Sequence, residues 1–373
     1  MTSASRTARA AASRGSGRAA VRFLATALPG LGVLLAEELV AELADRAEVE
    51  RIGGQFGGDV DKTVGHDGRN DLVGFTASGG TQLLPRIAED VFVEIGSTKR
   101  RADPRRVAEL LIESNRLDRG LSVLTTQGRH PRAAESVHVV TRVLSEDDFL
   151  RTELRHALEQ RLVAVRPRWS IADPGALEVW VVEVADGFVA GLRLTDSSQR
   201  HRHRRARERT GSLRASVAAA MVRLAGDAER ICDPCCGSGT ILAEALALDR
   251  EVTGSDSDPD AVTAARANLP EGIDIRMADA RALPHLDSSI NAVVSNLPFG
   301  SKFPIDNPVQ WYTDVLAEFA RITAPYGRVV ILAPARPAFT RALQQTTSLR
   351  LDRRVDINLL GAGVSIWVLR REA

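Results

Sequence analysis

The segment Ile231–Thr240 (ICDPCCGSGT) constrains the fold more than any other stretch of the chain. A short apolar run ends at Asp233, the glycines Gly237 and Gly239 follow, and a helical pattern begins at Thr240. Glycine lets a backbone pass close to a ligand because it has no Cβ, and the first turn of a helix has free N–H groups. No Lys-Ser or Lys-Thr pair follows the glycines, which excludes a P-loop. The segment therefore predicts a strand, a ligand-binding loop and a helix.

This segment belongs to a longer alternation of helices and strands over residues 211–373. Helical periodicity covers residues 213–224, 240–248, 259–268 and 311–322. Apolar runs predict strands at residues 230–233, 251–255, 273–277, 292–295 and 328–332, and a closing pair at 354–358 and 364–369. Alternation at this spacing is typical of a parallel sheet with helices on both faces. We expect a doubly wound, mainly parallel α/β domain here.

Residues 21–195 have a different, mixed pattern. The elements expected there are strands at 21–27, 121–125 and 136–143, helices at 31–43, 85–95, 107–115 and 148–165, and short strands between glycines at 51–82. A turn at Asp186-Gly187 joins the strands 177–184 and 187–194 into a hairpin. Such mixtures predict small α+β units. Residues 196–210 then form a basic linker.

The charges nearly cancel over the whole chain, with 49 Lys and Arg against 48 Asp and Glu, so net charge predicts no polyanion partner. Their distribution is uneven, because residues 200–209 read RHRHRRARER. Such a run can bind phosphates by releasing counterions, or it can be a solvated linker. A hydrophobic content of 44% excludes a wholly disordered protein.

The termini and the cysteines indicate the compartment. No segment has the ~18 to 20 continuous apolar residues that span a bilayer, so no membrane partner is expected. Residues 1–20 contain no acid, as in transit peptides, but we expect a disordered tail. The three cysteines are Cys232, Cys235 and Cys236, which gives no disulfide framework and favours the reducing cytoplasm. Cys232-x-x-Cys235 resembles half of a zinc motif, but no second pair follows and no metal is expected.

Two acids after the glycine loop indicate a nucleoside cofactor. Asp256 ends the next expected strand, 23 positions after Asp233, and a carboxylate at this spacing accepts hydrogen bonds from ribose hydroxyls. Asp279 follows the third strand, where it can accept a bond from an adenine amine. Either acid alone could be a helix cap or a turn residue. The candidate cofactor-binding residues are Asp233, Cys235, Gly237, Ser238, Gly239, Asp256, Asp279 and Asn296.

The fourth expected strand ends in Ser295–Gly300 (SNLPFG), which we call the catalytic loop. It resembles the Asn/Asp-Pro-Pro-Tyr/Phe loop of class I methyltransferases that act on planar nitrogen. An exocyclic amine is a poor nucleophile because its lone pair is delocalised into the ring, and acceptors on its hydrogens favour pyramidalisation. By this resemblance, the catalytic candidates are Asn296, Leu297, Pro298 and Phe299. The Asn296 side-chain oxygen and the Leu297 carbonyl would be the two acceptors, and the Phe299 ring would stack on the base. The alternative is a turn with a core Phe.

With DPCCGSGT, the catalytic loop makes residues 211–373 resemble the amino-methylating branch of the Rossmann-like methyltransferases, which use S-adenosylmethionine. Residues 209–213 (RTGSL) resemble the segment that enters the catalytic domain in THUMP-containing guanine-N2 methyltransferases, although Ala215-Ser216 replaces a proline that usually follows. Residues 22–39 resemble their ferredoxin-like module. Residues 136–194 resemble a THUMP domain, which binds the acceptor end of tRNA.

The resemblance implies N2-methylation of a guanosine in structured RNA, with tRNA as the favoured substrate. Residues 200–209 would then contact phosphates beside the site. Three other substrates stay open with the same chemistry: ribosomal RNA, adenine N6 in DNA and a protein glutamine amide. A catalytically silent RNA-binding protein is the alternative from another class. The modified position, the number of methyl groups and the oligomeric state cannot be predicted from these residues.

Overall fold

The computed structural model describes residues 20–43, 47–51, 70–78, 85–143, 145, 148–196, 199, 202, 206–207, 209, 212–298, 306–334, 336–359 and 362–373. The predicted disordered tail, up to residue 19, lies outside the described residues. The same holds for most of the glycine-rich stretch 51–82.

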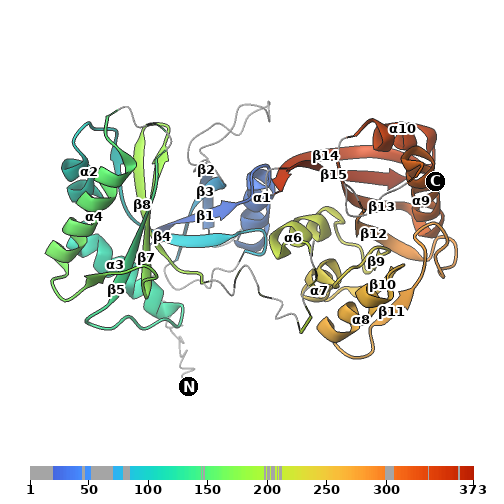
Figure 1. Cartoon of the computed structure of the whole chain (residues 1–373), viewed down its shortest axis with the longest axis horizontal. Coiled ribbons are helices and arrows are strands. Elements are labelled where there is room, and N and C mark those ends of the chain that lie inside the picture. Colours follow the sequence, from blue (N-terminus) through green and yellow to red (C-terminus); the bar gives the residue numbers. More distant parts are fainter. Residues whose placement is uncertain are drawn as a thin grey trace, which may run out of the picture.

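The N-terminal half forms one eight-stranded sheet in the order β2-β3-β1-β4-β8-β7-β5-β6 (Figure 1). All its neighbouring strands are antiparallel except β5, which runs parallel to β6 and β7. The strands are β1 (Ala20–Ala27), β2 (Ala47–Arg51), β3 (Asp71–Ser78), β4 (Asp90–Lys99), β5 (Ser136–Arg142), β6 (Ser170–Ile171), β7 (Leu177–Val184) and β8 (Gly187–Arg193). The expected hairpin of β7 and β8 is confirmed.

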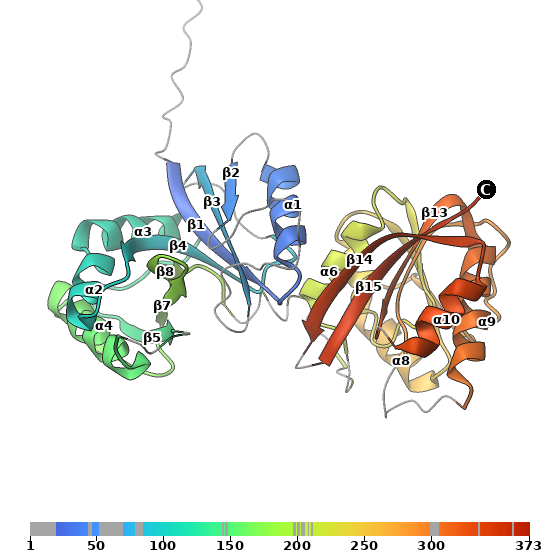
Figure 2. The ribbon, with the colours of Figure 1, turned by 90° about the horizontal axis from the view of Figure 1, so that it is seen from above.

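The helices of this half are α1 (Gly32–Leu43), α2 (Pro104–Leu111), α3 (Ser114–Thr126) and α4 (Arg151–Val165). Helices α2, α3 and α4 gather beside the β8-β7-β5 part of the sheet, while α1 lies beside the β2-β3-β1 part (Figures 1 and 2). Val107, Leu124 and Leu158, from α2, α3 and α4, are fully buried in the core that these helices share with the sheet.

The C-terminal half forms a seven-stranded sheet in the order β11-β10-β9-β12-β13-β15-β14, parallel except for the antiparallel β15. The strands are β9 (Arg230–Asp233), β10 (Glu251–Asp256), β11 (Asp274–Met277), β12 (Ile290–Asn296), β13 (Thr323–Ala333), β14 (Leu349–Leu359) and β15 (Ala362–Arg371). The helices are α6 (Ala215–Leu224), α7 (Thr240–Leu246), α8 (Pro259–Asn268), α9 (Pro308–Ile322) and α10 (Pro337–Gln345).

Helices cover both faces of this sheet. Along β12, Ala292 and Val294 pack into the core that contains α6 and α7, whereas Val293 packs into the core of α9 and α10. A strand with helices on both faces has apolar side chains at consecutive positions, as here. The predicted doubly wound α/β fold of the C-terminal half is confirmed.

Two element predictions in the N-terminal half are wrong. Residues 85–95 do not form a helix, because β4 begins at Asp90, and residues 121–125 form no strand, because they lie inside α3. Strand β4 lies between β1 and β8 and is buried on both faces, so its apolar run lost the alternation that identifies a strand. In α3, Gly120, Val123 and Leu124 are buried at helical spacing, which a five-residue window did not reveal.

The two halves are in contact near α1. The Asn358 N–H of β14 donates to the Pro29 carbonyl at 3.1 Å. The next residue, Gly30, has φ +94°, and a Cβ there would lie 2.0 Å from the Asp356 carbonyl oxygen. Asp71 fixes this turn by accepting the N–H groups of Gly30 and Gly32, both at 2.8 Å. The turn before α1 is therefore held against β14 at a close approach that needs glycine.

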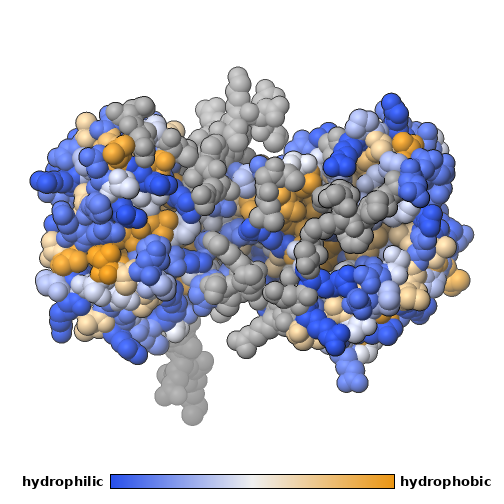
Figure 3. Space-filling model, in the orientation of Figure 1, coloured by the Kyte–Doolittle hydropathy of each residue, from blue (hydrophilic) through white to orange (hydrophobic). Residues whose placement is uncertain are grey.

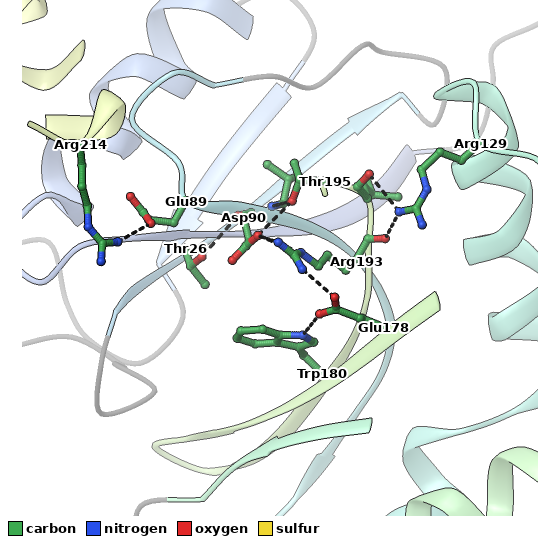
Figure 4. Close-up of polar contacts among 11 residues, drawn as sticks. Thr26, Glu89, Asp90, Arg129, Glu178, Trp180, Arg193, Thr195 and Arg214 are labelled. Carbon is green, nitrogen blue, oxygen red and sulfur yellow. Dashed lines mark hydrogen bonds and ion pairs between the residues drawn. The ribbon is translucent and has the colours of Figure 1, made fainter. Parts of the chain in front are cut away.

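A second contact between the halves runs through the segment before β4. Glu89 is buried, and its carboxylate accepts a hydrogen bond from Arg214, at the start of α6, at 2.9 Å (Figure 4). Ser216 donates to the other oxygen of Glu89. In the same view Arg193 of β8 joins Asp90 to Glu178. Glu89 therefore connects the segment before β4 to the start of α6, whereas Asp90 connects β4 to β8 within the N-terminal sheet.

Among the described residues, no helix is long and apolar enough to cross a bilayer. The face in Figure 3 shows hydrophilic residues over both halves, with apolar residues in separate patches.

Candidate active site

The carboxyl ends of parallel strands bring the predicted polar residues to one edge of the C-terminal sheet. Strand β9 ends at Asp233, β10 at Asp256 and β12 at Asn296. In the register of the sheet, Gly254 lies opposite Asp233, and Val293 lies opposite Cys232. This edge is where ligands bind in doubly wound sheets. The structure therefore brings these three residues together, as the sequence predicts.

The glycine loop is tied to β10 at this edge. Gly237 and Gly239 have φ +53° and +85°, a backbone conformation that favours glycine. The Gly237 N–H donates to Asp256 Oδ2 at 2.9 Å, and the Cys236 N–H donates to the Ser255 carbonyl at 2.9 Å. A Cβ on Gly237 would meet no atom of the described residues within 4 Å. The loop is open above Gly237, so its requirement for glycine there is conformational.

Ser238 connects this loop to the segment that enters the half. Its hydroxyl lies 2.9 Å from the Ser212 hydroxyl, and its carbonyl accepts the Asn268 side chain at 3.0 Å. Ser212 belongs to residues 209–213. This segment resembles the entry to the catalytic domain, and the structure places Ser212 against the glycine loop.

Asp233 is the most deeply buried acid of the edge, with 1% of the residue exposed. Its Oδ1 accepts the Ser295 hydroxyl at 2.8 Å and the Cys235 N–H at 3.2 Å. Burial raises the pKa of the Asp233 carboxyl to about 7, the Asp256 charge adds to the rise, and the two hydrogen bonds oppose it. Asp233 can therefore lose or hold a proton near neutral pH. No sequence pattern indicates the role of Ser295, which faces Asp233 because β12 and β9 are neighbours.

Asp256 and Asp279 occupy more open positions. Asp256 Oδ1 accepts the Asp258 N–H at 3.0 Å, and its other oxygen holds Gly237. Asp279 is exposed and forms an ion pair with Arg281 at 2.6 Å, and the hydrogen bond from Arg281 lowers the pKa of the Asp279 carboxyl. Asp279 also lines a shallow cavity of about 590 Å³ against α9. The Asp279 carboxylate is thus ionised at neutral pH and lies next to open space.

Asn296 carries a buried acceptor without a donor. Its Oδ1 is buried, and no side chain or backbone group of the described residues forms a hydrogen bond with it. The backbone of Asn296 is fixed by its pairing with Leu332 in β13. A buried acceptor left unpaired costs about 1–3 kcal/mol, so such atoms usually mark a place where a ligand or water supplies the donor. The Asn296 oxygen can therefore accept a hydrogen bond from a donor outside the described residues.

The catalytic loop continues from Asn296 with two further fixed residues. The Leu297 N–H donates to the Leu332 carbonyl at 3.2 Å, and the Leu297 side chain is buried. The Pro298 carbonyl accepts the Tyr312 hydroxyl from α9 at 3.2 Å. Phe299 lies outside the described residues, so its predicted stacking role stays a prediction. The sequence signal for Tyr312 was only an aromatic residue early in the helix after the loop.

The cysteines have a histidine neighbour that the sequence pattern does not show. His285 Nε2 lies 3.6 Å from Cys232 Sγ, although 53 residues separate them. Burial raises the pKa of all three thiols, which keeps them protonated and poor metal ligands at neutral pH. The described residues contain no group of three or more side chains suited to hold a metal ion.

Two arginines of the basic run have carboxylate partners within the chain. Arg202 Nε donates to Glu244 Oε1 at 2.8 Å, and Arg209 forms an ion pair with Asp258 at the start of α8. Arg207 is exposed, and its backbone N–H and carbonyl bond the Asn268 side chain. The described part of the run thus lies along the C-terminal half near the glycine loop.

Comparison with known proteins identifies the C-terminal half. Residues 202–360 match a family model described as "RMKL-like, methyltransferase domain". A tRNA (guanine(10)-N2)-dimethyltransferase of Methanothermobacter thermautotrophicus is 36% identical over 169 residues, 42% of this chain and 45% of that protein. The human U6 snRNA (guanine-N(2))-methyltransferase THUMPD2 is 30% identical over 137 residues, 34% of this chain and 27% of that protein. The chain thus spans less than half of the length of these relatives.

Among solved structures, TrmN from Thermus thermophilus is similar over both halves, with a TM-score of 0.73 and 24% identity. The similarity covers 94% of this chain and 99% of that one. A predicted N6-adenine-specific DNA methylase from Listeria monocytogenes has a TM-score of 0.67 and 16% identity over 94% of this chain and 96% of that one. At these identities the likeness shows the fold. Residues 202–360 are therefore similar to RMKL-like methyltransferase domains, a class of enzyme that uses S-adenosylmethionine.

Proposed function

We propose that this chain transfers the methyl group of S-adenosylmethionine to the exocyclic N2 amine of a guanosine in tRNA. The observation that carries the proposal is the buried, unpaired Oδ1 of Asn296 at the end of β12. An exocyclic amine has two N–H donors, and this oxygen is an acceptor without a donor among the described residues. The site therefore suits a substrate group that donates hydrogen bonds, as the exocyclic amine does.

The acids of the strand edge fit the cofactor. A carboxylate has about four lone-pair sites, and the two backbone N–H groups on Asp256 leave room for the ribose hydroxyls. The exposed Asp279 carboxylate suits the adenine amine, with Arg281 as its present partner. The rest of the cofactor would lie over the buried Asp233 carboxyl and the open glycine loop. The loop residues in question are Cys235, Gly237, Ser238 and Gly239.

The chemistry of the site follows from two hydrogen-bond acceptors and a methyl donor that is already activated. S-adenosylmethionine supplies a methyl group on a positively charged sulfur. The Asn296 oxygen accepts one N–H of the amine, and the Leu297 carbonyl accepts the other. These bonds hold the nitrogen in place and favour its pyramidal form, so that its lone pair is directed away from the base ring. Most of the rate then comes from positioning, and the methylated amine releases one proton to solvent.

Support for RNA as the substrate comes from the relatives and from the N-terminal half. Both curated relatives named above are guanine-N2 methyltransferases of RNA, one for tRNA and one for U6 snRNA. The N-terminal half shares its fold with that of TrmN, and residues 136–194 resemble a THUMP domain. We assign RNA binding to this half and the reaction to the C-terminal half. The exposed Arg207 fits a phosphate contact beside the glycine loop, whereas Arg202 and Arg209 have internal partners.

The cytoplasm is the compartment that fits this function. All three cysteines, Cys232, Cys235 and Cys236, are free, although Cys235 and Cys236 are adjacent in sequence. Free buried thiols are typical of a reducing environment.

The proposal is tested with purified protein, labelled S-adenosylmethionine, and separate pools of unmodified tRNA, ribosomal RNA and duplex DNA. Digestion and mass spectrometry then identify the labelled nucleoside. We expect N2-methylguanosine from the tRNA pool. Label in ribosomal RNA alone would redirect the substrate, and methyladenine in DNA would overturn the guanosine assignment. Binding of the cofactor with no label in any pool would favour a protein substrate or a silent RNA-binding protein.

The chain offers a matched control for the Asn296→Ala variant. Asn291 lies at the opposite end of the same strand, where its side chain accepts the Arg230 N–H at 3.0 Å. Asn291→Ala removes the same amide from β12 at a distance from the site. We expect label to be lost with Asn296→Ala and kept with Asn291→Ala. Equal loss of label in both variants would mean that disruption of β12, rather than removal of the Asn296 oxygen, abolishes the reaction.

A further inference from the structure

We infer that Tyr312 is a positioning residue for the catalytic loop and that it acts through the Pro298 carbonyl. The inference rests on the proposed function, because the orientation of the loop matters for an amine that the Asn296 and Leu297 oxygens hold. Tyr312 lies in the second turn of α9, a helix whose first turn is capped by the Asn307 side chain.

The loop is anchored residue by residue as it leaves β12. Asn296 pairs with Leu332, and the Leu297 N–H donates to the Leu332 carbonyl at 3.2 Å. Pro298 has no N–H, so its backbone can be held by hydrogen bonding only through its carbonyl. That carbonyl accepts the Tyr312 hydroxyl at 3.2 Å. Among the described residues this is the last anchor of the loop before residue 299.

The Tyr312 ring is fixed by its neighbours and does not depend on this hydrogen bond. The ring is buried and makes edge-on contacts with Trp311 and Phe339, at centroid distances of 5.2 and 5.3 Å. Phe339 of α10 in turn contacts Trp367 of β15 at 5.2 Å. Helices α9 and α10, which carry Tyr312 and Phe339, lie side by side in Figure 1. The aromatic contacts therefore hold the hydroxyl in place from the core.

Proline makes this anchor effective. Its ring fixes φ, so only one soft torsion separates the Pro298 carbonyl from the Leu297–Pro298 peptide plane, where most residues have two. Holding the Pro298 carbonyl therefore restricts the Leu297 carbonyl, which is one of the two proposed acceptors. Burial raises the pKa of the Tyr312 hydroxyl, which keeps it protonated and able to donate over the neutral range. A misplacement of about 1 Å at a reacting group can cost about 100-fold in rate.

The test compares Tyr312→Phe with Tyr326→Phe. Both substitutions delete one phenol hydroxyl, and Tyr326, on β13, is exposed and carries no role in the site. Methyl transfer is measured on the nucleic acid that the unaltered protein labels. We expect Tyr312→Phe to lower kcat about 10- to 100-fold, with the KM for cofactor within about twofold and the melting temperature nearly unchanged. Tyr326→Phe keeps the full kcat.

A second readout needs no methyl transfer. Hydrogen exchange of the Leu297 amide, followed by mass spectrometry or NMR, reports whether the loop is anchored. We expect faster exchange at Leu297 in Tyr312→Phe alone. Unchanged exchange and unchanged kcat in that variant would overturn the inference, and so would a loss confined to the KM for cofactor. If the labelled nucleoside is not N2-methylguanosine, the proposed function fails, yet the same comparison still decides the role of Tyr312. If no substrate is labelled, the exchange rates decide it.

Discussion

Arg86, which precedes β4 in the N-terminal half, forms an ion pair with Glu244 of α7, with 2.7 Å between Nε and Oε2. Arg202 of the linker holds the second oxygen of the same carboxylate at 2.8 Å. The Glu244 side chain is fully buried, and α7 is the helix that follows the glycine loop. The position of the glycine loop is therefore connected to both the N-terminal half and the linker through one carboxylate.

This buried cluster makes a prediction about stability. Removing one member of a buried ion pair leaves the remaining charge without compensation and typically costs about 3–5 kcal/mol. We expect Glu244→Ala to lower the free energy of unfolding by this amount, because it leaves both Arg86 and Arg202 without this carboxylate partner. Chemical denaturation followed by circular dichroism measures the change.

The control for Glu244 is an exposed pair in the same half. Glu251 and Arg230 lie 3.2 Å apart, with 73% and 51% of their side chains exposed. Exposed pairs contribute about 0–1 kcal/mol. Glu251→Ala should therefore change the unfolding free energy by less than about 1 kcal/mol. A similar small effect for Glu244→Ala would show that the buried cluster does not stabilise the contact between the halves.

The turn before α1 gives a prediction about the contact between the two sheets. Gly30 has φ +94°, and a Cβ there would lie 2.0 Å from the Asp356 carbonyl oxygen. Gly30→Ala combines backbone strain with a clash against a backbone atom, and we expect it to lower the unfolding free energy by at least about 2 kcal/mol. Gly363→Ala is the control, because a Cβ there meets nothing described within 4 Å. Thermal unfolding of both variants measures the difference, and equal melting temperatures would contradict the prediction.

The sequence predicted the C-terminal half well because the signals of a parallel sheet repeat. Each strand end carries a loop with a polar residue, and the register of β9, β10 and β12 then brings Asp233, Asp256 and Asn296 to one edge. Helix α8 has the predicted bounds, and Asp258 caps it with a side chain that accepts the Asp260 N–H. Local sequence patterns were sufficient to predict this half because its fold repeats one unit of strand, loop and helix.

Local patterns failed where distant contacts decide the structure. Strand β4 resembled a helix because its neighbours bury both of its faces, and those neighbours are far apart in sequence. The partners of Arg202 and Tyr312 are Glu244 and the Pro298 carbonyl, which belong to other elements, so no spacing in the sequence identifies them. Helix α10 was not predicted either. These features depend on how elements pack, which periodicity does not report.

The buried Asp233 makes a prediction about pH. Burial raises the pKa of this carboxyl from 3.8 to about 7 in the folded protein. Between these values the folded state keeps the proton while the unfolded state loses it, so this group lowers the unfolding free energy as pH rises from about 4 to about 7. The shift corresponds to as much as about 4 kcal/mol. Well below pH 4 both states are protonated, and the group then no longer makes stability depend on pH.

Asp233→Asn tests this dependence, because the amide keeps an acceptor for Ser295 and does not titrate. Chemical denaturation at about pH 5 and about pH 8 is measured for both proteins, so that the contributions of other groups cancel. We expect the stability of Asp233→Asn relative to the unaltered protein to increase from pH 5 to pH 8. A constant difference between the two proteins would mean that Asp233 does not hold its proton in this window.

Substitutions at Asn296 separate the acceptor from the shape of the side chain. Asn296→Ala removes the oxygen, and we expect kcat to fall about 100-fold, as when one preorganised hydrogen-bonding group is lost from an active site. Asn296→Asp keeps an oxygen at the same place, so it should retain much more of kcat than Asn296→Ala. The new carboxylate lies at the same sheet edge as Asp233, and repulsion between the two acids should make kcat of this variant depend on pH. Steady-state kinetics across pH measures both effects. If Asp and Ala at position 296 reduce kcat equally, the oxygen is not the group that holds the amine, and the assignment of the reaction to this loop fails.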